Sequence, residues 1–104
     1  MNVRRVNLDV DWAVEGPGIV AVAEAVGAVP GVQAANVTLT EIDAETIGSD
    51  LCVEGEHVDL QTLTDAIEQA GAVVHSIDQL VIGERLVEHR PGRSAAAHVR
   101  RCAR

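Results

Sequence analysis

The apolar residues of this chain recur with two different periods, and the order of these periods limits the fold to a small set. Val6, Leu8 and Val10 alternate with polar residues, which predicts a strand with one buried face. A Gly-Pro-Gly turn follows, and apolar residues at helical spacing then predict a helix over residues 19–29. The chain therefore opens with a strand and a helix.

The rest of the pattern adds three strands and a second helix. Period-two stretches predict strands over residues 32–42, 47–53 and about 73–81. Before the last strand, Asp59 is suited to cap a helix that ends at Gly71. This order is typical of the ferredoxin-like βαββαβ sandwich, an α+β fold with a four-stranded antiparallel sheet. Right-handed crossovers place the first strand between the third and fourth, with both helices on one face.

The chain has 104 residues, of which 47% are hydrophobic, enough for one core. We therefore expect a single ferredoxin-like domain over residues 1–90. From Pro91 the sequence is rich in arginine and alanine, so we expect a flexible basic tail over residues 91–104. No apolar run approaches the ~18 residues of a membrane span, and no signal peptide precedes the first strand.

Charge is distributed unevenly along the chain. There are 16 acidic residues and 8 basic ones, all arginine, and no basic residue lies between Arg5 and Arg85. The acidity excludes a basic-patch nucleic-acid binder as the first interpretation. Acidic self-repulsion weakens at molar salt, where the Debye length is ~3 Å, so the pattern favours a halophilic protein. The alternative, a GC-rich genome, explains the missing lysine but not the long arginine-free stretch.

The two cysteines, Cys52 and Cys102, lie far apart, and neither belongs to a CxxC motif. This spacing favours a reducing cytoplasm over a disulfide framework or a zinc site. We therefore expect a cytoplasmic protein.

The predicted strands place several carboxylates on the sheet face that no helix covers. Asp9 and Asp11 lie near the end of the first strand, and Asp50 and Asp78 belong to its neighbours. Clustered oxygen ligands suit Ca²⁺ or Mg²⁺, whereas like charges opposed across strands are otherwise destabilising. We therefore expect a divalent-cation site here. The alternative is the ordinary solvated surface of a halophilic protein.

The turn after the second predicted strand offers further oxygen ligands. Glu41 and Asp43 lie there, with Glu45 close by. Asp43, Glu45, Gly48 and Glu54 also have the spacing of an EF-hand loop. That segment is predicted to form a β-hairpin rather than to join two helices, so the turn acids are expected to hold a cation only loosely.

No arrangement of side chains predicts an enzyme. His75 shares the parity of Ile77, so we expect it to face the helices as a buried or half-buried, hydrogen-bonded histidine; the alternative is an acid, a base or a metal ligand. The spacing supports no Ser-His-Asp set, and there is no phosphate-binding glycine loop.

Two apolar residues of the last strand suggest a partner surface. Leu80 and Ile82 share the parity of Asp78, which leaves them on the uncovered face or at a strand edge. Exposed apolar pairs of this kind favour association, so we expect a homo-oligomer.

Two family resemblances follow from these motifs. Residues 30–39 and 66–71 resemble heavy-metal-associated domains, but the loop over residues 11–16 has no cysteine, so copper transfer is not implied. The chain is more similar to the archaeal domain-of-unknown-function 211 family, over residues 3 to about 90. The similarity is carried by Arg5-Val6-Asn7-Leu8-Asp9, Gly31-Val32, Asn36-Val37-Thr38-Leu39-Thr40-Glu41-Ile42-Asp43, His75-Ser76-Ile77-Asp78 and Val81-Ile82-Gly83.

The second resemblance implies a small cytoplasmic archaeal protein that forms a ring-like or other homo-oligomer and has no established activity. By motif match, its implied metal ligands are Asp9, Glu41, Asp43 or Asp78. Taken together, we expect a non-enzymatic homo-oligomeric domain that binds Ca²⁺, Mg²⁺ or a small ligand through carboxylates. The alternative is a regulatory module that takes up a metabolite or partner protein on the open sheet face. Neither membrane nor nucleic acid is expected as a partner.

Overall fold

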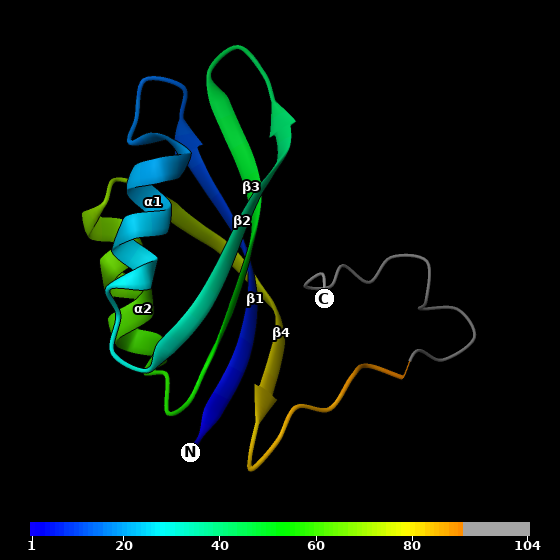
Figure 1. Ribbon diagram of the computed structural model, residues 1–104. Coiled ribbons are helices and arrows are strands. Elements are labelled where there is room, and N and C mark those ends of the chain that lie inside the picture. Colours follow the sequence, from blue (N-terminus) through cyan, green and yellow to red (C-terminus); the bar gives the residue numbers. More distant parts are fainter. Residues whose placement is uncertain (91–104) are drawn as a thin grey trace.

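The structure is a computed structural model that describes residues 1–90. Its elements are β1 (Val3–Ala13), α1 (Gly18–Gly27), β2 (Val32–Ile42), β3 (Thr46–Gly55), α2 (Leu60–Gln69) and β4 (Val73–Ile82) (Figure 1). The predicted ferredoxin-like α+β order is confirmed. The basic tail predicted over residues 91–104 lies outside the described residues.

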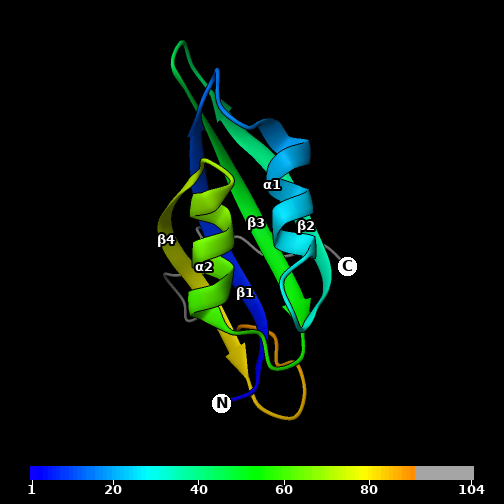
Figure 2. The ribbon, with the colours of Figure 1, turned by 90° about the vertical axis from the view of Figure 1, so that its left-hand side faces the viewer.

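The four strands form one antiparallel sheet in the order β2-β3-β1-β4. β1 therefore lies between β3 and β4, as right-handed crossovers predict. Both helices lie on one face of the sheet (Figure 2). We call the opposite face the bare face; it consists of Arg5, Asn7, Asp9 and Asp11 of β1 and their cross-strand partners.

The core between the sheet and the helices consists almost entirely of small aliphatic side chains. Val6, Leu8 and Val10 of β1 are at most 1% exposed, on the face that the period-two pattern predicts. The fully buried helix residues are Val22, Val26, Leu63 and Ile67. Trp12, the only aromatic residue, belongs to the same cluster and is 3% exposed.

The ends of α2 follow the predicted capping pattern. Oδ1 of Asp59 accepts the backbone N–H of Gln61 at 3.1 Å, and Gly71 follows the helix with φ +99°. Each helix has 10 residues, and in the part of the chain that the structure describes no helix is long and apolar enough to cross a membrane.

Two glycines allow the start of β2 to approach the end of β3. A Cβ atom at Gly55 would overlap the carbonyl oxygen of Gly31, and Gly31 itself has φ +92°. The carbonyl of Gly31 accepts the backbone N–H of Glu56 at 3.0 Å. Gly55 therefore makes possible the contact that closes this end of the sheet.

A β-bulge in β4 shifts the faces of its last residues. The pairing passes from Asn7–Gln79 to Leu8–Ile77, which leaves Asp78 as the extra residue. Beyond the bulge, the side chains of β4 again alternate between the two faces of the sheet, but each lies on the face opposite to the one that regular alternation would give.

The bulge decides where the exposed apolar residues of β4 lie. Leu80 pairs with Val6, which faces the helices, so Leu80 and Ile82 lie on the helix side of the sheet. β4 is an edge strand, and these side chains are 44% and 50% exposed. The sequence predicted that these two residues lie either on the uncovered face or at a strand edge, and in the structure they lie at a strand edge.

Candidate functional site

On the bare face, strand pairing places carboxylates in rows that run across the strands. In one row Asp9 of β1 pairs with Asp50 of β3, which pairs with Thr38 of β2. Directly paired residues have Cβ atoms only ~4.5–5.5 Å apart. Two acidic side chains therefore lie opposite one another in the middle of this face.

Beside this row lies an open depression of about 480 Å³, which we call the acidic depression. It is lined by Asp9, Asp11, Thr40, Glu41, Gly48 and His75. Gly48 pairs with both Asp11 and Glu41, and a Cβ atom there would lie 3.3 Å from Oδ1 of Asp11. The missing side chain of Gly48 thus makes room between two carboxylates.

His75 faces this depression instead of the helices. Its Nδ1 lies 3.9 Å from Oδ2 of Asp11, and its side chain is 67% exposed. The prediction of a buried histidine is wrong because the pairing of β1 with β4 shifts again between Asp9 and Val10. The shift leaves His75 as an extra residue, and such bulges re-aim side chains.

Two of the predicted metal ligands make other contacts. Oδ1 of Asp43 accepts the backbone N–H of Thr46 at 3.1 Å, which closes the turn between β2 and β3. Oδ1 of Asp78 accepts the hydroxyl of Ser76 at 2.8 Å. The structure therefore brings Asp9, Asp11 and Glu41 together, with Asp50 beside them, but not Asp43 or Asp78.

These carboxylates do not form a ready-made ligand set. Within residues 1–90, no group of three or more histidine, cysteine, aspartate or glutamate side chains is arranged to hold a metal ion. Ca²⁺ normally takes 6–8 oxygen ligands at about 2.3–2.6 Å. The acidic depression is wider and more open than such a site requires.

At the other end of the bare face, a buried arginine is held between two glutamates. The side chain of Arg5 is 2% exposed, and its Nε donates to Oε2 of Glu54 at 3.0 Å. Its Nη1 and Nη2 donate to the two carboxylate oxygens of Glu88 at 3.2 and 3.1 Å. The hydrogen bonds to Glu88, and then those to Glu54, raise the pKa of Arg5 against the effect of burial.

Sequence reasoning missed this ion-pair cluster, although a signal for it was present. Arg5 has the parity of Asn7 and Asp9 on a strand predicted to be central. A cation in that position needs acidic partners. The cluster ties residues 83–90 to the sheet, because Glu88 follows the last strand.

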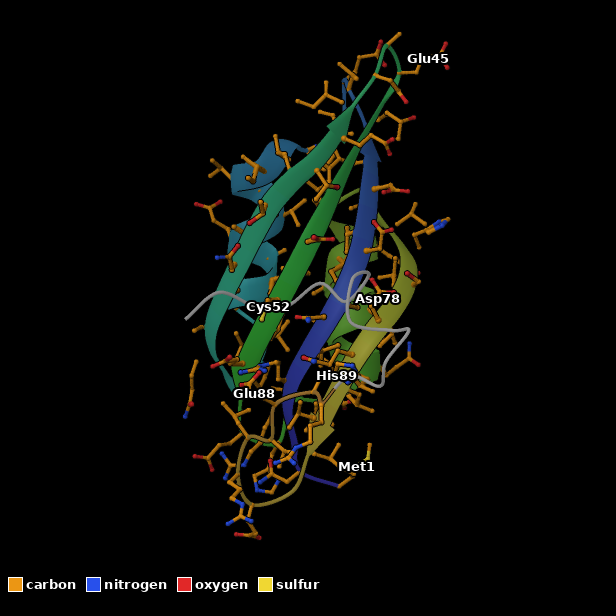
Figure 3. All side chains as sticks on the ribbon, turned by 90° about the vertical axis from the view of Figure 1, so that its right-hand side faces the viewer. Met1, Glu45, Cys52, Asp78, Glu88 and His89 are labelled. Atoms are coloured by element: carbon orange, nitrogen blue, oxygen red, sulfur yellow. The ribbon has the colours of Figure 1, made fainter. Side chains whose placement is uncertain are left out.

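Cys52 lies in the middle of the bare face, where it pairs with Asn7 and Asn36 (Figure 3). It is disulfide-bonded. The expectation that the cysteines belong to a reduced protein without disulfides is therefore wrong for this residue.

Comparison with known proteins gives two similarities. The model of the DUF211 family, described as uncharacterized ArCR, matches residues 4–95. The uncharacterized protein MJ0319 of Methanocaldococcus jannaschii is 33% identical over 86 residues, which are 83% of this chain and 88% of that protein. Neither description names an activity, a ligand or a partner.

Proposed function

The chain belongs to the DUF211 family of uncharacterised archaeal proteins, and from this premise we propose that it is a non-enzymatic protein that binds a hydrated divalent cation in the acidic depression. One observation carries the proposal. Asp9, Asp11 and Glu41 line one open space, and a glycine at its floor keeps that space clear.

The geometry favours a cation that keeps its water. Mg²⁺ dehydrates reluctantly and is commonly held by one or two carboxylates while several waters remain bound. The depression of about 480 Å³ is open to solvent, so it has room for a cation together with its bound waters. The same width leaves the carboxylates too dispersed for the many direct oxygen contacts of Ca²⁺. We therefore expect Mg²⁺ to bind through its waters.

The exposure and contacts of His75 support binding rather than acid–base chemistry. His75 is largely exposed, and its contact with Asp11 at 3.9 Å exceeds hydrogen-bond distance. Binding without turnover is the simpler use of these groups.

Amide chemical shifts followed during titration with MgCl₂ at fixed high KCl test the proposal. We expect a Kd on the order of 1 mM, with the shifts centred on Asp11, Glu41 and Gly48. Asp11→Asn with Glu41→Gln should weaken binding at least about tenfold. Glu24→Gln with Glu68→Gln removes the same charge from the exposed helix surfaces and should leave the Kd unchanged.

A second titration separates water-mediated from direct binding. Cobalt hexammine resembles hydrated Mg²⁺ but cannot release its ammine ligands, so it should compete for the same amides. Tight Ca²⁺ binding without competition from cobalt hexammine would contradict a hydrated site. Absence of any Mg²⁺-dependent shift, or equal binding by both double variants, would remove the cation-binding proposal altogether.

We further propose that copies of the chain associate through the edge of β4. Ile77, Leu80 and Ile82 project from this edge strand and are 44–50% exposed, an apolar row that a monomer would leave in water. Light scattering at high KCl should show an oligomer, which Leu80→Lys with Ile82→Lys should dissociate. A monomeric wild-type protein at 100 μM (about 1 mg/ml) would contradict this proposal.

A further inference from the structure

The guanidinium of Arg5 binds two carboxylates, of which only one belongs to the sheet. Glu54 is the cross-strand partner of Arg5 on β3, so strand register fixes it beside Nε and Nη2 of Arg5. Glu88 instead accepts hydrogen bonds from Nη1 and Nη2 with its two oxygens, at 3.2 and 3.1 Å. This paired geometry is the one in which arginine recognises a carboxylate. One edge of a buried guanidinium is therefore a carboxylate site, and Glu88 fills it.

Charge balance does not require the second carboxylate. Arg5 and Glu54 together are neutral, so Glu88 gives the cluster a net charge of −1. The excess anion lies in residues 1–90, which already contain 16 acidic residues and four arginines. A guanidinium has five N–H donors, and buried donors need acceptors. The second carboxylate is thus explained by the donors that Glu54 leaves open rather than by neutrality.

Glu88 belongs to a segment that can move without disturbing the sheet. We call residues 83–90 the strap. Its start is fastened at Gly83, whose N–H donates to the carbonyl of Asn2 at 2.8 Å and whose carbonyl accepts Nε of Arg4 at 2.7 Å. Residues 84–90 belong to no helix or strand, and they lie on the bare-face side of the sheet (Figures 1 and 3). Rotation of the backbone after Gly83 withdraws Glu88 and leaves the strands in place.

A cleft lies beside this second ion pair. Its volume is about 380 Å³, within the range of about 300–1,000 Å³ that is typical of small-molecule sites. Residues 79–82 at the end of β4 form one side, and residues 87–89 of the strap form the other. Val81, the cross-strand partner of Arg5, contributes apolar surface, as does Val87 of the strap. The cleft therefore combines apolar surface with a neighbouring cationic group.

We propose that Arg5 and this cleft form a binding site for a small organic acid with an apolar body, and that the carboxylate of Glu88 is a built-in occupant that the acid displaces. The carboxylate of the ligand accepts the hydrogen bonds from Nη1 and Nη2, while its apolar part enters the cleft. Glu88 then moves away with the strap. This site shares no lining residue with the acidic depression, so it does not depend on the proposed cation function.

The tether of Glu88 determines which concentrations of acid the site senses. Glu88 follows the fastened residue Gly83 by only five positions. A group on a short tether competes at an effective concentration on the order of millimolar. The wild-type protein therefore responds to an acid that is present at millimolar concentration or above.

Removing the built-in carboxylate tests the proposal. Potassium 3-methylbutanoate is titrated into the full chain, with KCl adjusted to keep the potassium concentration constant, and amide chemical shifts are followed. Glu88→Gln should bind roughly tenfold more tightly than the wild type, because a charged hydrogen-bonded competitor is lost. Glu84→Gln removes the same charge from an exposed position of the strap and should bind as the wild type does. The uncharged amide of the same acid should not bind.

Trypsin measures displacement of the strap in the wild-type protein. No arginine or lysine lies between residues 6 and 84, and proline follows Arg90, so the bond after Arg85 is the tryptic site of the strap. Cleavage of this kind follows the population of the open form. At ten times the Kd of Glu88→Gln, the acid should speed cleavage after Arg85 roughly tenfold, as measured by the mass of the products. The amide should leave the rate unchanged.

Three results would overturn the proposal. Equal affinity of the wild type and Glu88→Gln, or no binding by either, would mean that Glu88 occupies no ligand site. Inorganic phosphate binding as tightly as the acid would overturn the selectivity for a carboxylate. Binding by Arg5→Met with Glu54→Gln and Glu88→Gln, which lacks the guanidinium, would place the ligand elsewhere. Circular dichroism shows whether each variant is folded, and if Glu88→Gln is not, an unchanged trypsin rate in the wild type would still overturn the displacement of Glu88.

Discussion

Replacing both carboxylates that hold Arg5, by Glu54→Gln together with Glu88→Gln, is expected to lower the free energy of unfolding by about 3 kcal/mol. The guanidinium is 2% exposed, and the double change leaves it without an opposite charge. Removing the partner of a buried charge typically costs about 3–5 kcal/mol. Glutamine keeps one oxygen that accepts a hydrogen bond, which places the expected loss at the lower end of that range.

The single replacements are expected to cost much less than half of the double one. Glu54 and Glu88 are 35% and 41% exposed, so water screens each of them and limits either loss to about 1 kcal/mol. Either glutamate alone still neutralises Arg5. The double-mutant cycle should therefore show a coupling energy of about 1 kcal/mol.

Urea unfolding at fixed KCl, followed by the fluorescence of Trp12, measures these losses. Trp12 is the only tryptophan and is 3% exposed in the core, so its emission reports global unfolding. Adding Arg5→Met to the double variant should recover most of the loss, because it removes the uncompensated charge and keeps an apolar side chain. Glu56→Gln, an exposed neighbour, should change stability by less than about 0.5 kcal/mol.

Two results would refute this reasoning. One is a loss below about 1 kcal/mol in the Glu54 and Glu88 double variant, which would mean that water reaches the guanidinium. The other is failure of Arg5→Met to recover stability, which would mean that the glutamates matter through packing rather than through charge.

The remaining predictions concern backbone packing and salt. Gly55→Ala should cost more than about 3 kcal/mol or prevent folding, because its Cβ would overlap the backbone of Gly31, whereas Gly27→Ala, whose Cβ meets nothing within 4 Å, should stabilise by about 0.5–1 kcal/mol. Equal effects of these two changes in urea unfolding would contradict the close approach of β2 and β3. The melting temperature should rise by roughly 5–15 °C between 0.1 M and 2 M KCl, because residues 6–84 hold 15 acids and no arginine or lysine. A melting temperature that stays level in calorimetry would contradict the role given to self-repulsion.

The sequence predicts the bare face better than it predicts the local arrangement on that face. Alternation along β1 places Asp9 and Asp11 together, because a central strand with one buried face has only one regular pattern. His75 breaks the rule because a register shift between β1 and β4 re-aims it toward Asp11. No glycine or proline marks this register shift or the one at Asp78, so the periodicity of the sequence alone does not predict either of them.

Asp43 and Asp78 show a similar limit. Their residue type suits a cation ligand, but the same oxygens also accept nearby backbone or hydroxyl hydrogens. Whether each carboxylate binds a cation or accepts these hydrogen bonds depends on the local backbone, which is the β2–β3 turn for Asp43 and the bulge of β4 for Asp78.

By itself, the sequence determined the order of the elements, the buried face of β1 and the acidity of the domain. These follow from the period of apolar residues and from composition, which are local properties. Only the tertiary structure decided the clustering of Arg5 with Glu54 and Glu88, the glycine-lined gap beside Asp11, and the position of His75. Each of these joins residues distant in the chain, so it depends on strand register and bulges, which are fixed when the sheet packs against its helices.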